Sequence, residues 1–285
     1  MKRVSIYVKL VLAFIIFLIL AFLVKGGGLS DFIKTSLGTA SFLFGIILAF
    51  SIANRHTRLG AIRSSLREQD AILINIYYLS KTFGNSIVNK VRELMDNLLI
   101  SQIDYKLEDI GIESPKRLKV LYLFLEKLKS KSNVQKEAKG KILGGLEQLE
   151  KTQKEVEYQI KNEMMFYEWI SLLVLGGVIL FCLFYINVAS FTSVIVITFL
   201  STAVVFLLLV LNELDSLTWQ ERNWIWGPLS KLFEELDLVP YFPEGVFSNG
   251  RIKLDQFELK KVRIAHYPNL YPSTKGKKIE IVKVR

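Results

Sequence analysis

The residues whose types and spacing could do chemistry lie in and just after one apolar stretch near the N-terminus. Gly38, Phe42 and Ile46 recur at steps of four, so a helix places them in one stripe on one face. Arg55 and Arg58 follow directly after the stretch. If several copies of this helix surround an axis, Phe42 and Ile46 would form a hydrophobic constriction, and the two arginines would ring its mouth and concentrate anions. The pattern therefore predicts a pathway for inorganic anions.

A plainer structural interpretation of the same residues stays open. An apolar stripe on a membrane helix usually faces lipid or another helix, and arginines just beyond a span usually only anchor it. Ser41 and Gly45 form an adjacent stripe of small residues, which lets a neighbouring helix approach closely.

The sequence offers no constellation that an enzyme would need. It contains no G-x-x-x-x-G-K-[ST] phosphate loop and no H-E-x-x-H zinc motif. His56 and His266 have no neighbours at ligand spacing, and the single cysteine, Cys182, lies in an apolar stretch, so a disulfide framework and a Cys/His metal cluster are both excluded. We therefore expect neither an enzyme nor a bound cofactor or metal.

Four apolar runs must position the candidate residues, and each is long enough to cross a bilayer. A helix needs about 20 apolar residues to span a hydrocarbon core of roughly 30 Å. The hydrophobic fraction of 51% and the mean hydropathy of +0.33 agree with such a class. The first run could instead be a signal peptide, but no A-x-A-like cleavage site follows it. The runs occupy residues 5–24, 35–53, 166–187 and 191–211.

The distribution of charge predicts the orientation of these spans. The two connections within the hairpins are short and carry few charges or none, whereas the middle segment and the tail hold most of the lysines and arginines that give the net charge of +10. The positive-inside rule therefore places both termini and the insertion in the cytoplasm. We expect a multi-pass protein of the cell (inner) membrane, with hairpins at residues 1–53 and 166–211 and cytoplasmic regions at residues 54–165 and 212–285.

The insertion between the second and third spans is predicted to be helical throughout. The helix of the second span has no breaker at its inner end, so we expect it to continue to about Ser80, with Gly84 interrupting the pattern. Ser114 and Pro115 predict the start of a further helix that ends near Lys129.

A last helix of the insertion is expected to start near Lys141 and to run unbroken into the third span. Its apolar residues alternate steps of four and three, which is a heptad seam of about three repeats. We expect this seam to pack onto the extension of the second span rather than to form a separate coiled coil. The seam comprises Ile142, Leu146, Leu149, Gln153, Val156 and Ile160.

The C-terminal region combines aromatic and basic residues. Trp219, Trp224 and Trp226 come soon after the fourth span, as in an interfacial belt. Pro228 predicts the start of an amphipathic helix, and residues 277–284 alternate weakly as a strand does. The tail is strongly basic, and contact with anionic membrane lipids explains it more simply than a nucleic-acid partner, which we do not expect.

A coupled transporter is disfavoured because the spans lack the acids and histidines that proton or ion coupling usually keeps at depth. Passive conduction and a non-conducting scaffold both remain. Such a scaffold would use its cytoplasmic helices and basic tail to bind a protein partner or anionic lipid.

Several short motifs, together with the layout of spans, resemble the bestrophin family. Ser41-Phe42-x-x-Gly45 is similar to the S-F-x-x-G of the bestrophin second span. Residues 45–79 resemble the bestrophin-like group of prokaryotic membrane proteins. They contain F-S-I-A-N-R-H-T-R, then an Arg-rich turn and then E-Q-D-A-I-L. The L-V-L-N-E-L-D run at residues 209–215 is similar to the end of their fourth span.

The resemblance implies an all-α integral membrane protein with four transmembrane helices and a helical cytoplasmic insertion between spans two and three. It also implies a homopentamer around a central, chloride-selective anion pore, whose neck positions map onto Gly38, Phe42 and Ile46. The sequence departs from the family pattern in three respects: paired tryptophans after span two are absent, the acidic calcium clasp after span four is missing, and Gly38 would widen the neck.

Overall fold

The computed structural model describes residues 6–28, 30–105, 114–217, 225–248, 259–269 and 271–284. The chain divides into two compact units. The first consists of Met1–Leu59 and Glu163–Trp219, and the second of Gly60–Asn162 and Gln220–Arg285.

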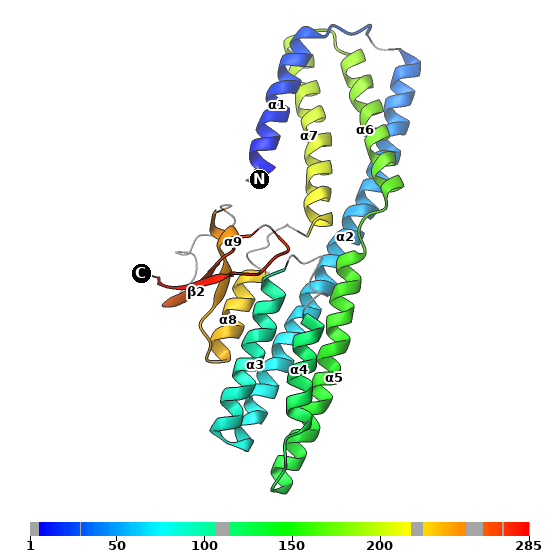
Figure 1. Cartoon of the computed structure of the whole chain (residues 1–285). Helices are drawn as coiled ribbons and strands as arrows, with labels where there is room; N and C mark the ends of the chain where they lie inside the picture. The colour runs from blue at the N-terminus through cyan, green and yellow to red at the C-terminus, as the bar shows by residue number, and fades with distance from the viewer. Residues whose placement is uncertain are drawn as a thin grey trace. The chain divides into compact units, whose positions relative to one another are not determined.

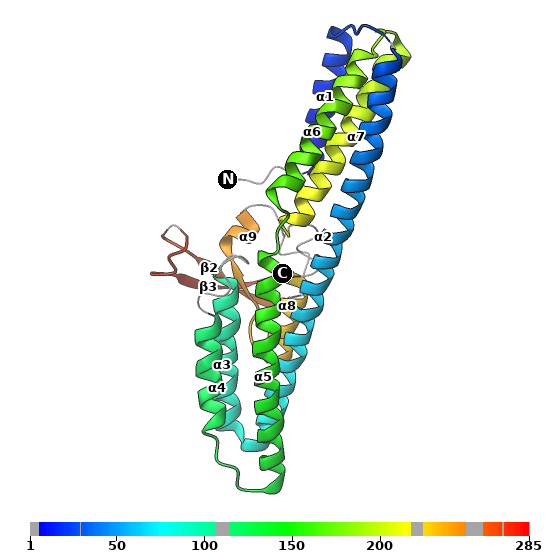
Figure 2. The same cartoon turned by 90° about the vertical axis from the view of Figure 1, so that its right-hand side faces the viewer.

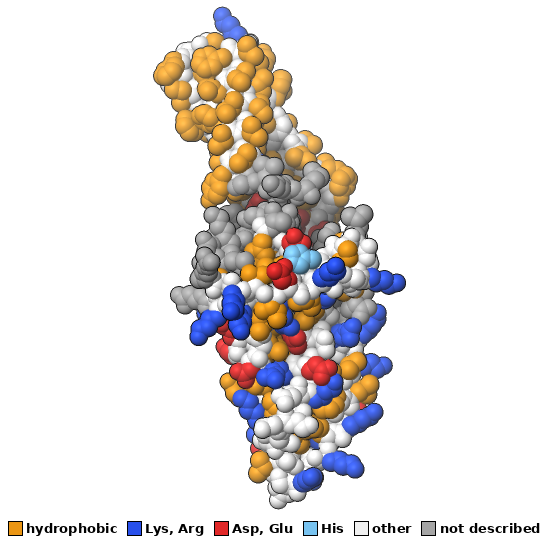
Figure 3. Space-filling view, turned by 60° about the vertical axis from the view of Figure 1, so that its left-hand side comes forward, with side chains coloured by type: hydrophobic (Ala, Val, Ile, Leu, Met, Phe, Trp, Pro, Cys, Tyr) orange, Lys and Arg blue, Asp and Glu red, His pale blue; other side chains and the backbone are white. Residues whose placement is uncertain are grey.

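The first unit is a bundle of apolar helices. Helix α1 (Ile6–Leu23) lies beside α7 (Phe191–Asp215), and α6 (Phe166–Tyr185) lies beside the first part of α2 (Asp31–Ser80) (Figures 1 and 2). All four are long and apolar enough to cross a membrane, which agrees with the four predicted spans. The fourth helix continues to Asp215, past its predicted end at residue 211. The surface of this unit is dominated by hydrophobic side chains (Figure 3), as expected of helices that face lipid.

The two short connections of the bundle meet at one end. The Gly26 N–H donates to the carbonyl oxygen of Asn187 across 2.8 Å, and the Asn187 side-chain amide donates to the carbonyl oxygens of Ala21 and Val24, both at 2.7 Å. Because these bonds satisfy main-chain carbonyls in the last turn of α1 and just past its end, they hold both hairpins together at this end. A side chain at position 26 would place its Cβ 2.0 Å from the Tyr185 carbonyl oxygen, so glycine is required there by close approach of the two loops.

The second unit is a helical assembly with a small sheet. It contains the second part of α2, the 3₁₀ turn η1 (Lys81–Phe83), α3 (Asn85–Ile103), α4 (Ser114–Glu126), α5 (Asn133–Lys161), α8 (Gly227–Glu235) and α9 (Glu244–Ser248). Helix α2 ends at Ser80 and Gly84 follows with φ of +96°, so the predicted end of this helix and the predicted interruption are confirmed.

Helix α5 packs onto the extension of α2, as predicted. The apolar residues of the heptad seam are buried, and Ile142, Leu146 and Leu149 belong to a core that includes Ile72 and Ile76. A Cβ at Gly145 would lie 3.5–3.6 Å from these two isoleucines, so the glycine allows the two helices to approach closely.

Both predicted ends of this helix are wrong. It starts at Asn133 rather than near Lys141, because the Ser132 hydroxyl accepts a hydrogen bond from the Gln135 N–H and caps the helix. It does not run unbroken into the third span, since Asn162 leaves the helical conformation and residues 162–165 are not helical.

The C-terminal region adds strands that the all-α class does not include. Strand β1 (Tyr241–Pro243) pairs parallel with β2 (Lys261–His266), which pairs antiparallel with β3 (Lys278–Lys283). The expected strand character of residues 277–284 is confirmed by β3, while β2 was not predicted. The fold is therefore predominantly helical with one three-stranded sheet in the described part of the chain.

Buried polar contacts attach this sheet to α3. The hydroxyls of Tyr241 and Tyr267 donate to Oδ1 of Asp104 at 2.5 and 2.7 Å, and Lys277 donates to its Oδ2. Burial raises the pKa of both tyrosines, so they remain protonated donors. The Arg263 guanidinium forms two bonds of 2.6 and 2.7 Å with the carboxylate of Asp96.

These contacts change the interpretation of the tail and of its aromatic residues. Arg263 and Lys277 are committed to acids within the unit, which removes two of the charges that the lipid interpretation used. The prediction of an interfacial belt is wrong for Trp226, which is buried in a cluster with Phe242 and Val262. Trp219 and Trp224 lie outside the described residues.

Candidate functional site

The stripe of Gly38, Phe42 and Ile46 lies on an exposed face of α2. Phe42 is 67% exposed and Ile46 is 40% exposed, and a Cβ at Gly38 would meet no atom within 4 Å. Large apolar side chains are normally buried, so this exposure marks the stripe as a face that either lipid or another protein chain must cover. The structure therefore brings these three predicted residues together.

The opposite face of α2 packs into the bundle. Ala40, Phe44 and Leu48 are buried there, and Gly176 of α6 allows close contact, because its Cβ would lie 3.6 Å from the Phe44 ring. Helix α2 is thus attached to its own bundle on one side only.

The two candidate arginines share one acidic partner. Arg58 Nη1 donates to the main-chain carbonyl oxygen of Asp215 at 2.8 Å and lies 3.5 Å from Oδ1 of the same residue, and Arg55 Nη1 lies 3.4 Å from that Oδ1. The Met164 N–H donates to the same Oδ1 at 2.9 Å. We refer to Arg55, Arg58 and Asp215 as the arginine clamp, which joins α2, the end of α7 and the residues before α6.

The arginine clamp does not lie below the neck stripe. Arg58 is only 4% exposed. Successive residues of a helix are separated by about 100°, so Arg58, sixteen residues after Phe42, projects roughly 160° away from it, and Arg55 projects roughly 140° away. In this structure both arginines therefore lie on the packed face of α2, away from Phe42.

The sequence reasoning missed the residue that does lie below the stripe. His56 comes fourteen residues after Phe42, which places it within roughly 40° of the phenylalanine around the helix. Its side chain is exposed. Counting helical angles from Phe42 would have found it, whereas counting distance along the chain favoured the nearby arginines. In the second unit, the same helix also leaves Arg67 exposed.

The described residues contain no group of three or more histidine, cysteine, aspartate or glutamate side chains that could hold a metal ion. Of the acidic residues near the end of the fourth span, Asp215 is occupied by the arginine clamp, and Glu221 lies outside the described residues.

Comparison with known proteins agrees with the resemblance seen in the motifs. A family model described as Bestrophin-like domain matches residues 6–216, which include the neck stripe, His56 and the whole arginine clamp. No curated protein and no solved structure matches the chain.

Proposed function

The chain belongs to the bestrophin-like family of membrane proteins, and from this premise we propose that it forms a homo-oligomeric, anion-selective channel, pentameric and permeable to chloride. Its neck consists of Gly38, Phe42 and Ile46, contributed by α2 of each subunit. Both termini and the insertion lie on the cytoplasmic side of the cell (inner) membrane.

One observation carries the proposal: the neck stripe is apolar, exposed and opposite the face by which α2 packs into its own bundle. A ring of subunits turns such faces toward a common axis, where apolar side chains make a constriction that controls wetting and conduction. The stripe is also the part of α2 that carries the family motif with Phe42.

The geometry changes the residues assigned to the inner mouth. The arginine clamp fixes helices within a subunit, so the proposal assigns the mouth to His56. Exposed cationic side chains along a low-dielectric pathway raise the local anion concentration.

Ion flux from the purified protein in liposomes tests this function, with chloride compared against potassium. We expect chloride flux to exceed potassium flux, and Phe42→Ala to raise it because the constriction widens. The matched control is Phe181→Ala on α6, where an equally exposed phenylalanine (62%) lies outside the neck and its loss should leave flux unchanged.

Two outcomes would contradict the channel. Equal flux in wild type, Phe42→Ala and Ile46→Ala would remove the neck assignment. If the folded, reconstituted protein gives no ion flux, the alternative is favoured. That alternative is a membrane scaffold whose cytoplasmic helices and tail bind a protein partner or anionic lipid.

A further inference from the structure

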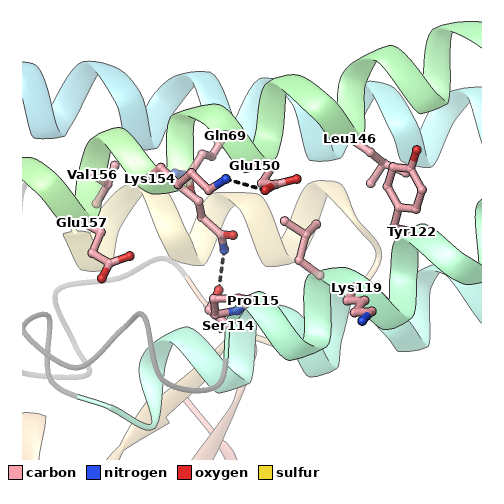
Figure 4. A pocket seen from close by; sticks show the side chains of 12 residues that line it. Gln69, Ser114, Pro115, Lys119, Tyr122, Leu146, Glu150, Lys154, Val156 and Glu157 are labelled. Atoms are coloured by element: carbon pink, nitrogen blue, oxygen red, sulfur yellow. Dashed lines mark hydrogen bonds and ion pairs between the residues drawn. The ribbon is translucent and has the colours of Figure 1, made fainter.

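A cleft of about 380 Å³ lies between α2, α4 and α5 within the second unit (Figure 4). Its volume is in the range of small-molecule sites, which run from about 300 to 1,000 Å³. Most of the lining is apolar and includes Leu118, Tyr122, Leu146 and Val156. Such walls suit an apolar ligand body.

At the polar end of the cleft, two side-chain hydrogen-bond donors have no acceptor among the residues that the structure describes. The Ser114 hydroxyl, which is 1% exposed, accepts hydrogen bonds from the side-chain amides of Gln102, at 3.2 Å, and Gln153. Both of its lone pairs are thus used, and its own O–H is left to donate. Gln69 is 5% exposed and lines the same cleft, and its Nε2 has no partner among the described residues. Buried donors of this kind are costly when unpaired, so they favour a ligand that supplies acceptors.

The charged residues at the rim of the cleft indicate which ligand charge the cleft favours. Glu150 is paired with Lys154 at 2.7 Å, and Glu157 is paired with Lys161 at 2.6 Å. Lys119 also lines the cleft and makes no ion pair within the described ranges. Among the described residues of the rim, the charge that has no ion pair is therefore positive.

From these observations we propose that the cleft between α2, α4 and α5 binds a small amphipathic organic carboxylate. Its head accepts hydrogen bonds from Ser114 and Gln69, with the Lys119 ammonium nearby. Its apolar body lies along Leu118 and Leu146. This site is separate from the neck stripe and does not depend on ion conduction.

Isothermal titration of the full chain in lipid nanodiscs tests the proposal, with octanoate as the probe and empty nanodiscs as the blank. Octanamide keeps the chain length and the carbonyl acceptor but lacks the charge, so it should bind roughly fivefold more weakly. Gln69→Leu should weaken octanoate binding about tenfold, and Lys119→Gln about threefold. Leu118→Trp fills the cleft and should abolish binding.

Lys136→Gln is the matched control, because it removes an exposed lysine at the start of α5 that does not line the cleft. It should bind octanoate like the wild type. No saturable binding beyond the empty nanodiscs would overturn the site, and so would wild-type affinity in a folded Leu118→Trp variant. Equal affinities for octanoate and octanamide would overturn the carboxylate assignment. If thermal unfolding shows that Leu118→Trp does not fold, the octanoate affinities of Gln69→Leu and Lys119→Gln test the site instead. Unchanged affinity in both variants would refute the proposal.

Discussion

Arg58 on α2 and Asp215 at the end of α7 are joined by a 2.8 Å hydrogen bond to the main-chain carbonyl oxygen and by an ion pair to the carboxylate. The two residues belong to the two motifs that carry the family resemblance in the second and fourth spans. Their contact gives these motifs a structural explanation: the arginine and the acid terminate the apolar parts of their helices and lock the helices together. The same carboxylate accepts the Met164 N–H in the break between α5 and α6.

Removing the charge of Asp215 should destabilise the bundle. Asp215→Asn keeps the shape of the side chain and an acceptor for Met164, but removes the carboxylate charge that pairs with the buried Arg58. Breaking such a pair costs about 2–3 kcal/mol where the groups are mostly buried. Thermal unfolding in detergent measures the change. Glu93→Gln is the control, since its pair with Lys90 is exposed and contributes only about 0–1 kcal/mol. Equal losses in the two variants would contradict the clamp.

A negative charge at position 56 should lower the anion preference of the channel. His56→Asp places a carboxylate within roughly 40° of Phe42 around the helix, where it repels anions from the mouth. We expect the ratio of chloride to potassium flux to fall roughly fivefold. Asn54→Asp introduces the same side chain at an exposed position roughly 120° from Phe42 and should leave the ratio unchanged. If the Asn54 variant has the larger effect, the pathway lies on another face of α2.

A side chain at position 26 should disrupt the end of the bundle where the two loops meet. Gly26→Ala puts a Cβ 2.0 Å from the Tyr185 carbonyl oxygen, and the backbone must move to accept it. We expect a loss of about 3 kcal/mol in the free energy of unfolding. Gly177→Ala is the control, because its Cβ meets nothing within 4 Å and alanine favours the helix by about 0.5–1 kcal/mol. Similar unfolding temperatures for both variants would show that the loops do not pack in this way.

The stability of the second unit should fall as pH rises through neutrality because of Asp70. Burial, and then the charge of Glu235, raise the pKa of this carboxyl to about 7 against the opposing effect of Arg67. A carboxyl whose pKa is higher in the folded state binds more protons there than in the unfolded chain. Its contribution is therefore fully present below the unfolded pKa of about 3.8 and is lost as pH rises through about 7.

Asp70→Asn should remove this part of the pH dependence. Between pH 5 and pH 8.5 we expect the wild type to lose roughly 2 kcal/mol more stability than the variant. Thermal unfolding across this range measures the difference, and Glu93→Gln, which changes an exposed acid, should follow the wild type. Parallel curves for wild type and Asp70→Asn would contradict a raised pKa.

Local patterns predicted much of the fold. The four spans were predictable because the length of an apolar run is a property of the sequence itself. The end of α2 was predictable because no residue before Gly84 breaks the helix. The buried seam of α5 followed from helical periodicity. The start of α5 was missed because it depends on the cap at Ser132, which lies outside the apolar seam.

The candidate site was only partly predictable. The neck stripe needs only the spacing of Gly38, Phe42 and Ile46, and the helix preserves it. The roles of Arg55 and Arg58 could not be read in the same way, because Asp215 is 157 residues away from Arg58 in the chain. The packing of α7 against α2 decides which face of the helix is occupied.

By itself, the sequence determined that this is a four-span membrane protein of the bestrophin-like family, since hydrophobic length and short motifs are local properties. The tertiary structure decided which charges are paired, where the long helices break, and that Ser114, Gln69 and Lys119 line one cleft. Those outcomes depend on side chains from distant segments meeting, and a buried charge or donor is satisfied only by the partner that packing brings to it.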